Sequence, residues 1–408
     1  MRRLTLTHWI LIATLVGAVI GYLDFYVWLG SDLAAVMRPF ATIFIRLIKS
    51  LVAPLIFATL VIGIAGQGDD VRQIGRVALR ALIYFQIVTT VALIIGMVAA
   101  HLGQPGAGLS LTGSAEAGER LASTRTTWQG VLENAVPASI IEAMGRNETL
   151  QIVFFALIFG AALTQVRGRP REVMLEMCES LAEVMFKFTG LVMLYAPVGV
   201  AAAVAVAIGT NGLGVVVSLG KLVLTLYGAL LVFVLGVMLP AALIARLRIG
   251  RFWHWSRQPT LIAFTTASSE AALPRALENM ERFGVPRRIA SFVLPTGYSF
   301  NLAGSTLYLG LASVFVAQAA GITLSFGTQV AMVLTLMLTS KGVAGVPRAS
   351  LVILSGTLSQ FGLPLEGIAV ILAVDVFMDM ARTAVNVLGN CLATAVVARW
   401  DGALEEQT

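Results

Sequence analysis

The strongest constraint in this sequence is a series of long apolar runs separated by short polar segments. His8–Trp28, Ile152–Val166 and Val215–Ala245 are examples. A helix of about 20 apolar residues spans the hydrocarbon core of a membrane. Comparable segments are 8–28, 37–66, 75–102, 149–167, 175–208, 215–246, 289–319 and 366–399. We therefore expect an all-α membrane protein with about eight transmembrane helices. Two further segments are long enough but polar in the middle.

The charged residues support this assignment by their number and by their position. Only 12% of the residues are charged, compared with about a quarter in soluble domains. A net charge of +6 could indicate a nucleic-acid-binding protein, but the arginines gather in alternate loops, as in cytoplasmic loops of membrane proteins. They are Arg2, Arg3, Arg72, Arg76, Arg80, Arg167, Arg169, Arg171, Arg246, Arg248, Arg251 and Arg257. This pattern predicts a multi-pass protein of a bacterial inner membrane, with both termini cytoplasmic and no nucleic-acid partner.

The sequence offers little for metal or cofactor chemistry. Cys178 and Cys391 lie in apolar surroundings without a metal or redox spacing, and His8, His101 and His254 are scattered. We find no phosphate-binding loop and no evident nucleophile–base set. We therefore expect no metal and no cofactor, and neither an enzyme nor a nucleotide-driven pump.

Two apolar segments carry polar residues at their centres. Residues 258–276 contain the run Thr265–Glu270, and residues 325–364 contain the run Thr339–Arg348. The apolar arms of the second segment have roughly 12–15 residues, which is too short to cross a membrane. Non-helical backbone at membrane depth is tolerated only where it is buried in protein or lines a cavity. Two re-entrant hairpins, one from each side in an inverted repeat, are typical of a transporter site.

The segment 289–319 is interrupted by the polar run Pro295–Ser305. Its glycines favour an unwound turn, and Asn301 could cap that turn or coordinate a ligand across it. Simple helix packing would account for the glycines alone. The density of polar residues favours a binding site.

The last apolar segment, 366–399, carries a stripe of polar side chains. At about 100° per residue, Asp379, Arg382 and Asn386 lie within about 40° of Asp375, and Thr383 lies beside them. A lipid-facing Asp costs several kcal/mol, so the stripe must face protein or water.

The stripe has two interpretations. Asp379 and Arg382 could form only a structural ion pair, but the other polar groups exceed what one pair consumes. Guanidinium binds a carboxylate through two parallel hydrogen bonds, and a carboxylate one turn away can accept an ammonium. The combination predicts a zwitterion with a second carboxylate, an acidic amino acid.

Four motifs resemble those of the glutamate transporter family, the dicarboxylate/amino acid:cation symporters. They are SSEAALP at 268–274, PTGYSFNLAGSTLY at 295–308, SKGVAGVP at 340–347 and DVFMDMARTAVNVLGN at 375–390. The resemblance covers essentially the whole chain and is strongest to bacterial proton/glutamate symporters. It implies eight transmembrane helices, two re-entrant hairpins and a homotrimer that works as an elevator. The implied scaffold comprises 1–74 and 104–208, and the implied transport domain comprises 75–103, 209–250 and 251–408.

The resemblance also implies roles for single residues. Arg382 would hold the substrate side-chain carboxylate and Asp379 the amino group, while Asp375 would brace the site. The remaining residues implied to bind substrate are Thr383, Asn386 and Ser305, with the hairpin tips adding Ser268, Ser269, Val346 and Pro347.

Three departures from the family pattern bear on the coupling ion. Asn390 and Ala303 stand where sodium-coupled members carry carboxylates, which puts at least two sodium sites in doubt. Arg348 stands where relatives usually have glycine, as either a tethered cation or a snorkelling side chain. Protons are then the expected partner, and Glu270 is the first candidate carrier, because burial at a hairpin tip disfavours the charged carboxylate. Glu270 could instead reach cytoplasmic water or pair with Arg275.

Other functions remain open at this stage. A C4-dicarboxylate carrier of the same fold is the nearest alternative, although Asp379 disfavours it because such a substrate has no ammonium. A sodium-coupled amino-acid carrier is the second alternative. A channel would need a continuous polar pore, and interrupted hairpins fit alternating access better.

Overall fold

The computed structural model describes residues 6–28, 33–65, 70–109, 136–146, 148–340 and 349–405. Every regular element within these ranges is a helix, which confirms the all-α prediction. The helices are α1 (Leu6–Tyr22), η1 (Leu23–Val27), α2 (Leu33–Ala65), α3 (Asp70–Gly103), α6 (Ile140–Arg146), α7 (Thr149–Gln165), α8 (Arg169–Asn211), α9 (Gly214–Phe233), η2 (Val234–Met238), α10 (Leu239–Ile244), α11 (Ile249–Thr266), α12 (Ser269–Phe283), α13 (Arg287–Phe300), α14 (Ala303–Ala319), α15 (Phe326–Thr339), α16 (Ala349–Gln360), α17 (Glu366–Leu372) and α18 (Asp375–Trp400).

Several of these helices have the length and composition of membrane-spanning segments. In the described ranges, five helical stretches qualify on both counts: Leu79–Gly103, Arg169–Thr210, Gly214–Ile244, Arg287–Ala319 and Asp375–Trp400. Four shorter apolar helices are Ile12–Val27, Ala53–Ile62, Gln151–Gln165 and Phe326–Thr339. The chain is therefore a multi-pass protein of membrane type.

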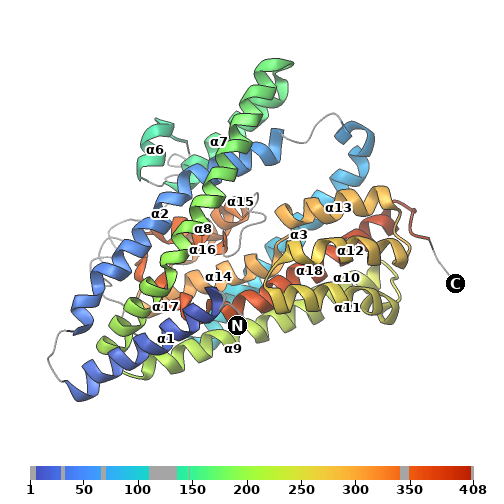
Figure 1. Ribbon diagram of the computed structural model, residues 1–408. Helices are drawn as coiled ribbons and strands as arrows, with labels where there is room; N and C mark the ends of the chain where they lie inside the picture. Colours follow the sequence, from blue (N-terminus) through green and yellow to red (C-terminus); the bar gives the residue numbers. More distant parts are fainter. Residues whose placement is uncertain are drawn as a thin grey trace, which may run out of the picture.

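The helices form two contacting groups (Figure 1). In the first, which we call the α8 group, α8 packs along α1 and α2, and α2 packs against α7. In the second, the α18 group, α18 contacts α3 and α9–α14, and α3 packs along α14. Helices α15, α16 and α17 contact members of both groups. The polar stripe of α18 consequently lies in the interior of its group.

Glycines set the closest helix contacts in both groups. Gly17 and Gly21 of α1 face the backbone of Ala201 and Ala205 on α8, the small-residue spacing by which membrane helices approach closely. In the α18 group, a Cβ on Gly96 of α3 would lie 2.0 Å from the carbonyl oxygen of Leu307 on α14. No side chain larger than hydrogen fits there without moving a helix.

The first interrupted segment forms a tight reversal between two contacting helices, α11 and α12. Ala267 occupies the left-handed region with φ +49°, and the Ser268 hydroxyl caps α12 by accepting from Ala271 N at 3.3 Å. Both helices contact α18. The second interrupted segment has its two helical arms, α15 and α16, in contact, and its polar centre, 341–348, lies outside the described residues.

The predicted interruption of segment 289–319 is confirmed. Helix α13 ends at Phe300 and α14 begins at Ala303, so that Asn301 and Leu302 are not helical. The amide of Asn301 donates to the carbonyl of Gly297 at 2.8 Å, which closes the end of α13.

The prediction of one helix over 366–399 was wrong. Two helices, α17 and α18, meet at Ala373 and Val374. The amides of these two residues bond to carbonyls three positions back, at 3.2 and 3.0 Å, and Val374 has φ −115° and ψ 0°. No glycine or proline marks this break, and as a result it was not visible in the sequence. Asp375 thereby becomes the first residue of α18, where the helix dipole stabilises a carboxylate.

The close approach of α3 and α14 gives a stability prediction. Gly96→Ala gains helix propensity of about 1 kcal/mol, but its methyl group meets a backbone oxygen that cannot rotate away, and overpacking costs about 1–3 kcal/mol or more. We expect a lower midpoint of thermal unfolding in detergent. Gly220→Ala is the matched control, because Gly220 lies in the interior of α9 with open space at its Cβ position. Equal midpoints for the two variants would contradict the packing.

Candidate functional site

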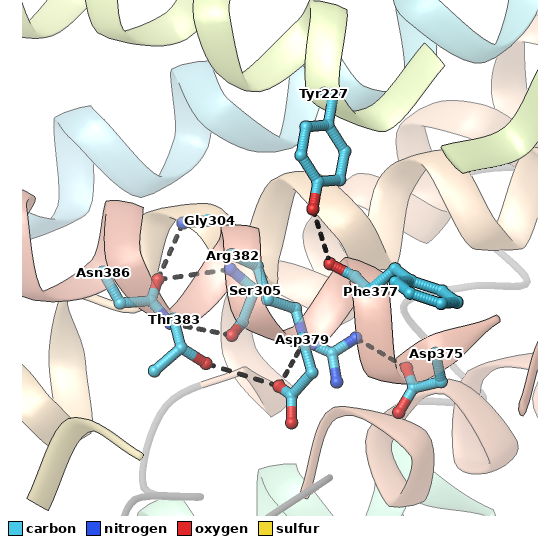
Figure 2. Close-up of polar contacts among 9 residues, drawn as sticks. All are labelled: Tyr227, Gly304, Ser305, Asp375, Phe377, Asp379, Arg382, Thr383 and Asn386. Atoms are coloured by element: carbon cyan, nitrogen blue, oxygen red, sulfur yellow. Dashed lines mark hydrogen bonds and ion pairs between the residues drawn. The ribbon is translucent and has the colours of Figure 1, made fainter. Parts of the chain in front are cut away.

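The polar stripe of α18 is buried, as predicted. Arg382 exposes 1% of its surface, Asp375 0% and Asp379 9%. Thr383 and Asn386 are buried beside them. These side chains gather with the start of α14 in one interior cluster (Figure 2).

Arg382 is the centre of this cluster. Its Nε donates to Asp379 Oδ1 at 2.9 Å, and its Nη1 donates to Asp375 Oδ1 at 3.0 Å. The ring of Tyr308, from α14, lies over the guanidinium with its centroid 4.2 Å from Cζ, which is a cation–π contact. Two edges and one face of the guanidinium are therefore held by protein.

The third nitrogen of Arg382 is different. Nη2 is buried and has no hydrogen-bond partner within the described part of the chain. A buried donor without a partner costs about 1–3 kcal/mol, and more when it is charged. The cluster can thus accept one anionic oxygen at Nη2 of Arg382.

Thr383 and Asn386 make different contacts. The Thr383 hydroxyl donates to Asp379 Oδ1 at 3.3 Å. Asn386 reaches across to α14, where its Oδ1 accepts from the amides of Gly304 and Ser305 at 2.8 and 3.2 Å. Its Nδ2 donates to Ser305 Oγ at 2.9 Å. Asn386 therefore orients the start of α14, with both ends of its amide occupied.

Gly304 makes that approach possible. A Cβ at Gly304 would lie 2.4 Å from the carbonyl oxygen of Arg382, so α14 touches α18 at the residue that carries the guanidinium. Sequence reasoning missed Tyr308 as part of the site. The signal was its spacing of four from Gly304, which places both on one helix face.

Asn301 and Asn390 form a second polar contact further along α18. Asn301 Nδ2 donates to Asn390 Oδ1 at 2.9 Å, and both side chains are fully buried. Asn301 Oδ1 and Asn390 Nδ2 have no hydrogen-bond partner in the described ranges. Two neutral amides thus face each other, and one of them, Asn390, stands at the position where the resemblance implies a carboxylate in sodium-coupled members.

The remaining predicted residues belong to the two hairpin segments. Glu270 is exposed in the first turn of α12, which corrects the expectation that its carboxyl is buried at the hairpin tip. In the first turn of α12, Glu270 and Ala271 lie on the exposed side, whereas Ala272 is buried. Ser268 and Ser269 are half-buried, whereas Val346, Pro347 and Arg348 lie outside the described residues. The described residues contain no group of three or more His, Cys, Asp or Glu side chains able to hold a metal ion.

Known proteins resemble this chain along nearly its whole length. The sequence model of the Sodium:dicarboxylate symporter family matches residues 6–400. A Proton/glutamate-aspartate symporter of Escherichia coli (strain K12) is 43% identical, over 98% of this chain and 93% of the relative. A Proton/sodium-glutamate symport protein of Bacillus caldotenax is 39% identical, over 100% and 97%. A C4-dicarboxylate transport protein of Solibacter usitatus (strain Ellin6076) is 39% identical, over 99% and 94%.

The family model matches residues 6–400, and the relatives are similar over nearly their whole length. Both comparisons indicate a transporter and not an enzyme. The chain belongs to the sodium:dicarboxylate symporter family and is a membrane transporter.

Proposed function

We propose that this protein is a secondary symporter that carries an acidic amino acid, glutamate or aspartate, together with protons. The observation that carries the proposal is the buried Nη2 of Arg382, which lacks a partner in the described ranges and lies beside a carboxylate pair. A substrate carboxylate bound at Nη2 would give this nitrogen a charge-assisted hydrogen bond. We assign the substrate ammonium to the carboxylate of Asp379, which lies one helical turn from Arg382 on α18.

The surrounding contacts support this assignment of roles. The hydroxyl of Thr383 bonds to Asp379 and that of Ser305 to Asn386, and the main carboxylate of an amino acid could bind at these hydroxyls. The reversal at Ser268 belongs to two helices that contact α18, and Val346 and Pro347 would close the site from the second hairpin. Asp375 fixes Nη1 of Arg382 and braces the guanidinium from behind.

The arrangement of the helices is compatible with an elevator mechanism in a homotrimer. We assign 1–74 and 104–208 to the scaffold and 75–103, 209–250 and 251–408 to the transport domain. The contacts within the α8 group and within the α18 group support this division. In this proposal α11–α12 and α15–α16 are re-entrant hairpins, eight helices cross the bilayer, and both termini face the cytoplasm of a bacterial inner membrane, as the arginine distribution indicates.

Protons are the proposed coupling ion because the amide pair of Asn301 and Asn390 offers no negative charge to a sodium ion. Concentrating an anion against a negative interior requires an inward positive charge, which supplies about 2.3 kcal/mol per 100 mV. Asp375 and Asp379 are buried carboxylates at the cluster. Glu270, exposed at the start of α12 beside the reversal, is a third candidate carrier. The printed names of relatives include both proton and proton/sodium symporters, so that sodium remains the competing ion.

A C4-dicarboxylate is the second candidate substrate. Relatives named as C4-dicarboxylate transport proteins are 39% and 40% identical to this chain. Such a substrate would engage Arg382 equally well, but it has no ammonium group for Asp379 to accept.

Arg382→Ala tests the substrate carboxylate site. Truncating one member of a buried charge pair costs about 2–5 kcal/mol, which is more than about thirtyfold in affinity. We expect acidic amino-acid uptake into proteoliposomes to be lost and neutral amino acids to become better substrates, while size-exclusion chromatography shows a folded protein. Arg146→Ala is the control, because Arg146 forms an exposed pair with Glu142. Uptake of glutamate at the wild-type rate by Arg382→Ala would refute the assignment.

Asp379→Asn distinguishes the two candidate substrates. An amide cannot compensate an ammonium charge, so the variant should lose affinity for glutamate relative to succinate. Competition of each compound against radiolabelled substrate measures this ratio. Tighter binding of glutamate to Asp379→Asn than to the wild type would count against the role of Asp379.

The coupling ion gives a separate prediction. Uptake should be driven by an inward proton gradient in sodium-free buffer and should quicken as the outside is acidified. Glu270→Gln should permit exchange but block net accumulation, whereas Glu278→Gln on the same helix, which only breaks exposed pairs with Arg275 and Arg282, should leave both intact. A strict requirement for sodium at constant pH is the result that would overturn proton coupling.

A further inference from the structure

Tyr227 of α9 makes a polar contact that the substrate site does not explain. Its hydroxyl donates to the carbonyl oxygen of Phe377 in α18 at 2.9 Å (Figure 2). The side chain is 38% exposed in the single chain, so Tyr227 is no part of the packed core. Polar side chains of membrane helices form such hydrogen bonds across helix interfaces.

Phe377 lies next to the residues that hold Arg382. It lies in the first turn of α18, between Asp375 and Asp379, the two carboxylates that hold Arg382. This turn begins directly after the break at Ala373 and Val374.

The break separates that turn from the preceding helix. α17 packs mainly on α2 and α8, with smaller contacts to α14 and α18, whereas α18 packs mainly within the α18 group. The backbone bonds at the junction are of the three-residue type, which forms the tighter and less stable turn. The first turn of α18 therefore depends on lateral contacts to keep its direction.

We infer that Tyr227 is a positioning residue for the substrate site. Its hydrogen bond ties the first turn of α18 to α9 and so holds Asp375 and Asp379 at the distances that orient Arg382. Tyr227 acts through the backbone of Phe377 and does not touch the substrate. This inference rests on the proposed binding of an acidic amino acid at Arg382.

A merely structural tie between two helices is the competing explanation, and the chain contains a matched control for it. Tyr195 of α8 also donates its hydroxyl to a phenylalanine carbonyl, that of Phe40 in α2, at 3.3 Å. This second bond joins two helices of the α8 group and lies away from the cluster. Tyr→Phe removes a single oxygen in each case.

The test compares Tyr227→Phe with Tyr195→Phe in proteoliposomes. One neutral hydrogen bond corresponds to about a fivefold change in affinity. We expect Tyr227→Phe to raise KM for glutamate about fivefold with an unchanged maximal rate. Tyr195→Phe should leave KM unchanged. Since KM and maximal rate are separated, a loss of folded protein cannot imitate the result.

Three results would overturn the inference: an unchanged KM in Tyr227→Phe, an equal rise of KM in both variants, or a loss of maximal rate alone. Failure of the proposed function itself is recognised independently, because the wild-type protein would then show no saturable uptake of glutamate or aspartate. If the wild type takes up glutamate and Tyr227→Phe has an unchanged KM, the proposed function stands and only the positioning role is rejected.

Discussion

The burial of one guanidinium between two carboxylates is the constraint on which the rest of this structure depends. Arg382, Asp375 and Asp379 lie almost entirely out of contact with solvent, and charges in such surroundings persist only when paired and hydrogen-bonded. The helices around α18 supply these conditions. Tyr308 covers one face of the guanidinium, while Gly304 lets the start of α14 reach the backbone of Arg382.

Interruptions of helices surround this buried group. The chain leaves helical geometry at Ala267, at Asn301 and at Val374. The first two stretches adjoin helices that contact α18, and the third directly precedes α18. Backbone without helical hydrogen bonds is tolerated at membrane depth only where protein or a cavity surrounds it. In a continuous helix, the backbone N–H and C=O groups at these points would bond within the helix and would not be available to other groups. The interruptions at Asn301 and Val374 therefore place the polar groups of Asn301 and Asp375 in the interior of the α18 group.

Particular residues show how far sequence reasoning reached. The polar stripe, the interruption near Asn301 and the reversal near Ser268 were predicted, because each leaves polar or helix-breaking residues inside an apolar run. The break before Asp375 was missed, since Ala373 and Val374 are ordinary apolar residues. The expected burial of Glu270 was wrong, because exposure depends on the direction in which α12 leaves the turn.

The sequence by itself determined that the chain is an all-α membrane protein and which face of α18 is polar. Both follow from local regularities, the length of apolar runs and the helical period, which need no knowledge of distant residues. Only the tertiary structure decided which atoms meet. Asn386 pairs with Ser305, Asn301 with Asn390 and Tyr227 with Phe377 across 81, 89 and 150 residues. Such partners are selected by helix packing, and no local pattern encodes which helices become neighbours.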